Sequence, residues 1–125
     1  MPYTLSWETK GVVKTFTGFV SGEEFVRSVE EVVLDERFGE IEYIVNDLAA
    51  IDGHGMDEAK LNWIASMRVG SHSFNPKLRI IVVTRDPAVR RLAQMTTHGD
   101  VPGGSRTRAF DSMDEARAWL APRPC

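Results

Sequence analysis

The sequence predicts an α/β fold built on one mostly parallel sheet, and three observations support this prediction. Short β-branched and aromatic runs alternate along the chain with longer segments of helical periodicity. Two such runs precede the first helical segment, which indicates an antiparallel hairpin. Each later strand is separated from the next by a helix, as in right-handed crossovers between parallel strands. We therefore expect the order β-β-α-β-α-β-α-β-α, with about five strands and four helices, in one domain over residues 1–121 and a disordered tail at 122–125.

Alternating apolar and polar side chains predict the hairpin, and a capping sequence predicts the first helix. Residues 3–7 and 12–17 alternate apolar with polar side chains, as half-buried strands do. Ser21 is followed three residues later by Glu24, which forms a capping box and predicts a helix over about residues 22–36. The apolar residues of this helix share one face, so we expect that face to cover the sheet.

The next strand and helix contain the most informative pattern. An apolar strand at 42–48 leads through a small-residue loop at 52–55 into a helix predicted over 57–71. That helix carries two apolar stripes on nearly opposite sides. One stripe consists of Met56, Ala59, Trp63 and Met67, and the other of Leu61, Ala65 and Val69.

The second half of the chain repeats the strand-helix alternation. Residues 78–84 form a nearly continuous apolar run, which is typical of a strand covered on both faces and makes it our candidate for the centre of the sheet. Asp86 and Pro87 then begin a helix that closes near Gly99. A strand at 106–110 leads to a last helix capped by Ser112, with its inward face formed by Met113, Ala116, Trp119 and Leu120.

Composition and charge exclude several classes of protein. The chain has 18 acidic and 15 basic residues, a net charge of -3 and a pI near 5.6, so no global positive field favours nucleic-acid binding. Cys125 is the single cysteine and cannot form an intramolecular disulfide. No apolar run is long enough to span a bilayer, and the N-terminus lacks a basic region followed by an apolar stretch. We therefore expect a cytoplasmic protein that does not span a membrane.

The candidate site lies where the parallel strands end, because ligands of open α/β sheets bind at the carboxyl ends of the strands. Ser21, Asp86 and Ser112 are accounted for as helix caps, but capping explains neither His54 nor Arg85. The sequence predicts a ligand-binding or regulatory turn formed by Asp47, Asp52, Gly53, His54, Gly55 and Arg85.

No cofactor or metal site is predicted. His54 and His72 flank a helix of about 15 residues, which separates them by more than roughly 20 Å at 1.5 Å per residue. A small hydrolase or isomerase that uses His54 with Asp47 or Asp52 is the alternative from another class, although no nucleophile-elbow context accompanies any serine. Neighbouring carboxylates would favour a charged His54, which would let its protonation tune binding near neutral pH.

The second apolar stripe has two interpretations. It is either incidental, on a helix wedged between the sheet and a neighbour, or it is a homodimer interface or apolar ligand surface. The large side chains Trp63 and Met67 lie on the first stripe with Ala59, so we expect that stripe to face the sheet. The functional contact is then predicted at Leu61, Ile64, Ala65 and Arg68. In the opposite assignment Trp63 is the exposed anchor.

Residues 109–120 contain the pattern Phe-Asp-x-x-x-Glu-Ala-x-x-Trp-Leu. Together with the order of elements, the strand ending at Asp47-Leu48 and the turn at 52–56, this pattern resembles the SpoIIAA-like branch of the STAS (anti-sigma-factor antagonist) superfamily. The resemblance implies a mixed sheet of about five strands with four helices, and roles in partner binding, regulation or apolar-ligand binding. In the regulatory STAS proteins the corresponding turn reads Asp-Ser-Ser-Gly-Leu, and one serine is phosphorylated. Here Gly53 and His54 replace both serines, so the hydroxyl acceptor is absent.

Taken together, the sequence predicts a non-enzymatic binding or regulatory module that acts through a protein partner or a small apolar ligand.

Overall fold

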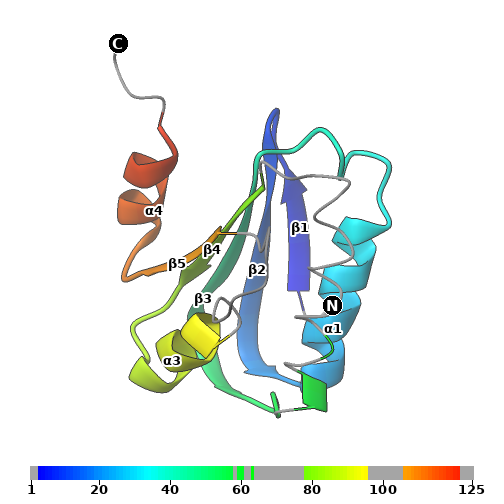
Figure 1. Cartoon of the computed structure of the whole chain (residues 1–125). Helices are drawn as coiled ribbons and strands as arrows, with labels where there is room; N and C mark the ends of the chain where they lie inside the picture. Colours follow the sequence, from blue (N-terminus) through cyan, green and yellow to red (C-terminus); the bar gives the residue numbers. More distant parts are fainter. Residues whose placement is uncertain (1–2, 58, 61–62, 64–77, 96–105, 122–125) are drawn as a thin grey trace.

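The computed structural model describes residues 3–57, 59–60, 63, 78–95 and 106–121, and the fold is seen in these residues. Its centre is a mixed five-stranded sheet in the order β1-β2-β3-β4-β5 (Figure 1). β1 pairs antiparallel with β2, and all other neighbours are parallel, as predicted from the sequence. The strands are β1 (Tyr3–Trp7), β2 (Gly11–Val20), β3 (Tyr43–His54), β4 (Arg79–Val83) and β5 (Arg106–Phe110).

Three helices are seen in the described part of the chain: α1 (Gly22–Val33), α3 (Pro87–Met95) and α4 (Met113–Leu120). Ala59, Lys60 and Trp63 are also helical, and the remainder of the predicted second helix lies outside the described residues. α1 ends at Val33 rather than near residue 36. Leu34 is its C-cap residue, and the amide of Leu34 donates to the carbonyl of Glu30. α1 and α4 lie on opposite sides of the sheet (Figure 1).

Both predicted N-cap serines form their capping hydrogen bonds. The hydroxyl of Ser21 accepts a hydrogen bond from the amide of Glu24 at 3.1 Å, and that of Ser112 accepts one from the amide of Glu115 at 3.2 Å. Each bond satisfies one of the amides that an α-helix leaves unpaired in its first turn.

One face of the sheet packs against α1. Phe16 of β2 is fully buried, and its ring lies 5.7 Å from that of Tyr3 and 5.4 Å from that of Phe25, measured between centroids. Val12 packs in the same layer with Val32 of α1. This contact confirms that the apolar face of the first helix covers the sheet.

The other face packs against α4. Ala116 is fully buried in a cluster with Val45, Ile81 and Val83. β4 is covered on both faces, as its continuous apolar run predicts. The centre of the sheet is nevertheless β3, with β4 next to it, so that part of the prediction is wrong.

A charged side chain lies within the α1 face of the sheet. Lys14 of β2 is 2% exposed, and its ammonium donates to the hydroxyl of Ser28 on α1 at 3.2 Å. The same ammonium lies 5.0 Å from the centre of the Phe25 ring, where a cation–π contact is favourable. The hydroxyl of Ser28 in turn donates to the carbonyl of Phe25, which links β2 to α1 through polar groups.

Candidate functional site

The predicted loop at residues 52–55 is mostly strand. β3 does not end at Leu48 but continues to His54, and β2 continues to Val20. Glycine and aspartate have low intrinsic strand propensity, and here the parallel pairing with β2 outweighs it by supplying backbone hydrogen bonds. The pairing with β4 stops at Asp47, so β2 and β3 extend together beyond it. We call residues 17–20 and 50–55 the ribbon end.

A β-bulge marks the start of the ribbon end. Thr15 pairs with Asp47 and Thr17 with Ala50, so β3 contains one residue more than β2 over this stretch. The carboxylate of Asp47 accepts a hydrogen bond from the amide of Ala49 at 3.2 Å. Asp47 therefore stabilises the bulge.

A second irregularity follows at the tip. Gly18 pairs with Ile51 and Phe19 with Gly53, which leaves Asp52 as an inserted, exposed residue. Gly18 has a φ of 65°, a left-handed conformation that glycine adopts without the strain a β-carbon would bring. The residue that follows this irregularity, Phe19, is 62% exposed.

The ring of Phe19 lies over glycine backbone. A β-carbon added at Gly53 would be 3.5 Å from Phe19 Cδ2, and one added at Gly55 would be 3.5 Å from Phe19 Cζ. The amide of Gly55 donates to the carbonyl of Val20 at 2.8 Å, which ties the end of β3 to β2. An exposed aromatic ring is thus held on a hydrogen-bonded ribbon.

His54 is held by its own turn. Its Nδ1 accepts a hydrogen bond from the amide of Met56 at 3.2 Å. Neither Asp47 nor Asp52 forms a hydrogen bond or ion pair with the ring in the described structure. The structure thus gives the predicted pairing of His54 with these carboxylates no support.

Arg85 follows β4 and is exposed. Nearby, the carboxylate of Asp86 accepts from the amide of Ala88 at 2.8 Å, which confirms its role as a helix cap. Arg90 and Asp111 form an ion pair at 2.5 Å. No described hydrogen bond or ion pair joins Arg85 to His54, so the six predicted residues of the turn do not form one bonded network.

The predicted contact residues Leu61, Ile64, Ala65 and Arg68 lie outside the described residues. The predicted inward stripe can be compared at three positions: Met56 is half-buried, and at Ala59 and Trp63 the prediction is wrong. Ala59 is exposed, and Trp63 is 40% exposed rather than packed on the sheet.

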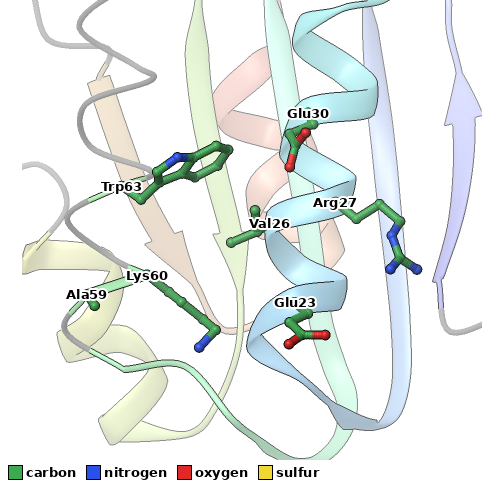
Figure 2. Close-up of a pocket in the computed structure, with 7 residues that line it drawn as sticks. All are labelled: Glu23, Val26, Arg27, Glu30, Ala59, Lys60 and Trp63. Carbon is green, nitrogen blue, oxygen red and sulfur yellow. The ribbon is translucent and has the colours of Figure 1, made fainter.

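Trp63 instead borders a cavity of about 610 Å³ beside α1, which we call the α1 cleft (Figure 2). Glu23 and Arg27 of α1 are exposed and Glu30 is half-buried, and the sequence did not predict a concave surface beside them. The cleft is lined by Glu23, Val26, Arg27, Glu30, Ala59, Lys60 and Trp63.

The opposite end of the sheet carries a paired cluster. The guanidinium of Arg117 donates two hydrogen bonds to the carboxylate of Glu8, at 2.7 and 2.6 Å. The hydroxyl of Tyr43 donates to the same carboxylate. The hydrogen bonds from Arg117, and secondarily that from Tyr43, lower the pKa of Glu8 to about 2 despite its partial burial.

Within the described ranges, no group of three or more His, Cys, Asp or Glu side chains could hold a metal ion. No helix in the same residues is both long and apolar enough to cross a membrane.

Solved structures share this arrangement of strands and helices over nearly the whole chain. The unphosphorylated anti-sigma factor antagonist SpoIIAA superimposes with a TM-score of 0.60 at 14% identity, covering 94% of this chain and 96% of that one. The chain has a SpoIIAA-like fold. An anti-sigma factor antagonist from Mycobacterium paratuberculosis gives a TM-score of 0.63 at 18% identity, covering 94% and 92% of the two chains.

An uncharacterized protein from Shewanella loihica PV-4 with a SpoIIAA-like fold gives a TM-score of 0.55 at 13% identity, covering 95% and 92%. No protein-family model and no curated protein matches the chain. These structural similarities confirm the STAS-type α/β architecture that the terminal pattern and the element order predict from the sequence.

Proposed function

We propose that this chain is a non-enzymatic regulatory module that binds a protein partner through the ribbon end. The observation that carries the proposal is Phe19, which is 62% exposed on a hydrogen-bonded ribbon. Large aromatic side chains that are exposed and rigidly held are frequent anchors of protein interfaces.

The fold supports the same role by analogy. Two of the similar structures are anti-sigma factor antagonists, and the proposed regulatory role agrees with theirs. The lack of a serine at Gly53 and His54 separates the proposed mode of action from phosphoserine switching at this turn. We expect the module to act in the cytoplasm.

A protein partner fits the ribbon end better than a small apolar ligand does. Small ligands bind in concave pockets that bury most of their surface. Phe19 projects from the ribbon instead, and the α1 cleft carries charged side chains from both of its walls. The predicted homodimer through Leu61 and Ile64 stays a prediction.

The geometry favours this function over the alternative hydrolase or isomerase. A general base needs hydrogen-bond reach to an orienting group, as in a His–Asp pair. His54 accepts from a backbone amide, and Asp47 accepts from another, so the two side chains are engaged separately.

Capture from native lysate tests the proposal with a matched control. Phe19→Ser removes the exposed ring, and Leu34→Ser removes another exposed apolar side chain, 79% exposed, at the far end of α1. We expect a partner captured by the wild type and by Leu34→Ser to be lost with Phe19→Ser, as read by quantitative mass spectrometry. Equal capture by all three proteins, or robust ester or phosphate turnover that His54→Ala abolishes, would contradict the proposal.

A further inference from the structure

We propose that the α1 cleft receives a cationic side chain, arginine or lysine, of the protein partner. This inference rests on the proposed function and names the chemistry of the partner. The walls of the cleft, its charge and its position beside the ribbon end favour this partner chemistry.

Part of the cleft wall is apolar, formed by Trp63, Val26 and the aliphatic stem of Lys60. Figure 2 shows the indole of Trp63 extending toward α1, with Val26 directed between Trp63 and Lys60. A β-carbon added at Gly22 would lie 2.3 Å from Lys60 Cδ, so the aliphatic stem of Lys60 packs directly on the start of α1. The ring and the two aliphatic surfaces can contact the hydrocarbon part of a bound side chain.

The charge available to a ligand is negative. Glu23 and Glu30 line the cleft seven residues apart on α1, about 10 Å along the helix axis. Neither carboxylate has an ion-pair partner among the described residues. The ammonium of Lys60 is engaged by the carboxylate of Asp57 at 2.9 Å, which offsets its charge.

Arg27 does not neutralise the cleft. Figure 2 shows its guanidinium directed away from Trp63. The guanidinium therefore lies on the side of α1 away from Trp63.

This combination selects a cation with an apolar stem. An ammonium or guanidinium over the face of an indole gains a favourable cation–π interaction. A carboxylate of the cleft, Glu23 or Glu30, can accept its hydrogen bonds, and both carboxylates repel an anionic ligand. A neutral side chain would use the apolar walls but would gain nothing from the two charges.

The cleft is continuous with the ribbon end, which favours a side chain of the same partner over a free amine. The ring of Phe19 lies over Gly55, and a β-carbon at Gly55 would be 3.4 Å from the amide nitrogen of Gly22. Gly22 in turn contacts the stem of Lys60. Phe19 and the cleft are therefore near neighbours, joined through the backbone of Gly55 and Gly22, and one partner can contact both.

Peptide titration of the full chain tests the chemistry directly. The probes are the blocked tripeptide Ac-Leu-Arg-Leu-amide and its citrulline and glutamate counterparts, since citrulline keeps the shape of arginine and removes its charge. We expect the arginine peptide to shift the Trp63 indole NMR signal saturably and to bind at least about tenfold more tightly than the citrulline peptide, a difference of about 1.4 kcal/mol. Equal affinity for the two peptides, or tighter binding of the glutamate peptide, would overturn the proposal.

Variants locate the site. Glu23→Gln and Glu30→Gln should each weaken binding of the arginine peptide several-fold, whereas Arg27→Gln should leave it unchanged or slightly tighter. Trp63→Leu keeps an apolar wall and should also weaken binding, followed in this variant by backbone amide shifts on α1. Unchanged binding in both glutamate variants would show that the peptide lies elsewhere and would overturn the proposal.

Further outcomes separate the two proposals. If phenethylguanidine binds with the same charge dependence but the arginine peptide does not, the site takes a free small molecule and the partner side chain is wrong. The peptide could bind with the expected charge dependence while Phe19→Ser still captures the partner. That result would overturn the proposed function and support the cleft as a cation site. Capture that depends on Phe19 with no peptide binding would overturn the cleft proposal alone.

Discussion

The two ends of the sheet differ in how their polar and aromatic side chains are used. At the amino end Glu8 is held by two hydrogen bonds from Arg117 and one from Tyr43. At the carboxyl end, Phe19 and Asp52 of the ribbon end are exposed to solvent. Side chains that are hydrogen-bonded within the chain contribute to its stability, whereas exposed side chains are available to a partner. The comparison predicts that substitutions at the amino end will affect folding and those at the carboxyl end will affect binding.

The largest effect on stability is expected from Arg117→Met, which removes both hydrogen bonds to Glu8. The side chains are 44% and 28% exposed, so solvent screens the pair, and we expect a loss of about 1–2 kcal/mol in the free energy of unfolding. Urea denaturation measures it. Arg85→Met is the control, because Arg85 is exposed and should be near neutral. Equal midpoints for the two variants would remove the contrast between the ends.

The pH dependence sharpens the same comparison. The pKa of Glu8 is lowered to about 2 in the folded chain, so the unfolded chain binds the extra proton between the unfolded value and pH 2. The stability from Glu8 is therefore present above the unfolded pKa of about 4.3 and lost as the pH falls toward 2. Between pH 6 and pH 2.5, the free energy of unfolding should fall less steeply for Arg117→Met than for the wild type. Parallel curves would exclude Glu8 as a major contributor.

A smaller effect is expected at the first bulge. Asp47→Ala removes the hydrogen bond to the amide of Ala49 and should cost about 0.5–1 kcal/mol in urea denaturation. Asp52→Ala changes an exposed carboxylate in the same ribbon and serves as the control. A larger loss for Asp52→Ala would mean that the bulge is not stabilised by Asp47.

The smallest effect on stability is expected from Phe19→Ser. Its ring is 62% exposed, so little apolar surface is lost from the fold, and the free energy of unfolding should change by no more than about 0.5 kcal/mol. Circular dichroism during urea denaturation measures this. A large loss would show that Phe19 is needed for folding and would reverse the expected division between the two ends.

The fold was largely predictable because its signals are local. Ser21 with Glu24, and Ser112 with Glu115, specify the starts of α1 and α4 through bonds that span three residues. The alternation of strand and helical periods then limits the topology to a mostly parallel sheet. By contrast, the burial of Lys14 depends on Ser28 and Phe25 lying above it, a contact that composition and periodicity do not encode.

The candidate site was less predictable because it depends on pairing between distant residues. The glycines of the segment at 52–55 predict a loop, and its pairing with β2, Phe19 with Gly53 and Val20 with His54, makes it strand. Trp63 was assigned to the core because it is large and apolar, yet it borders a cleft that exists only once α1 is placed beside it. The pattern of apolar and polar residues along one segment predicts which of its faces is polar. It does not predict where two segments together form a cleft.

The bulges of β3 have a consequence for variation in chain length. The pairing of residues 43–47 with both neighbouring strands is complete before the first extra residue occurs. Gain or loss of one residue between positions 48 and 52 would therefore change where the tip points without reversing the inward and outward faces of the core strand. Relatives with this fold can accordingly differ in length at this place and present differently aimed tips on the same sheet.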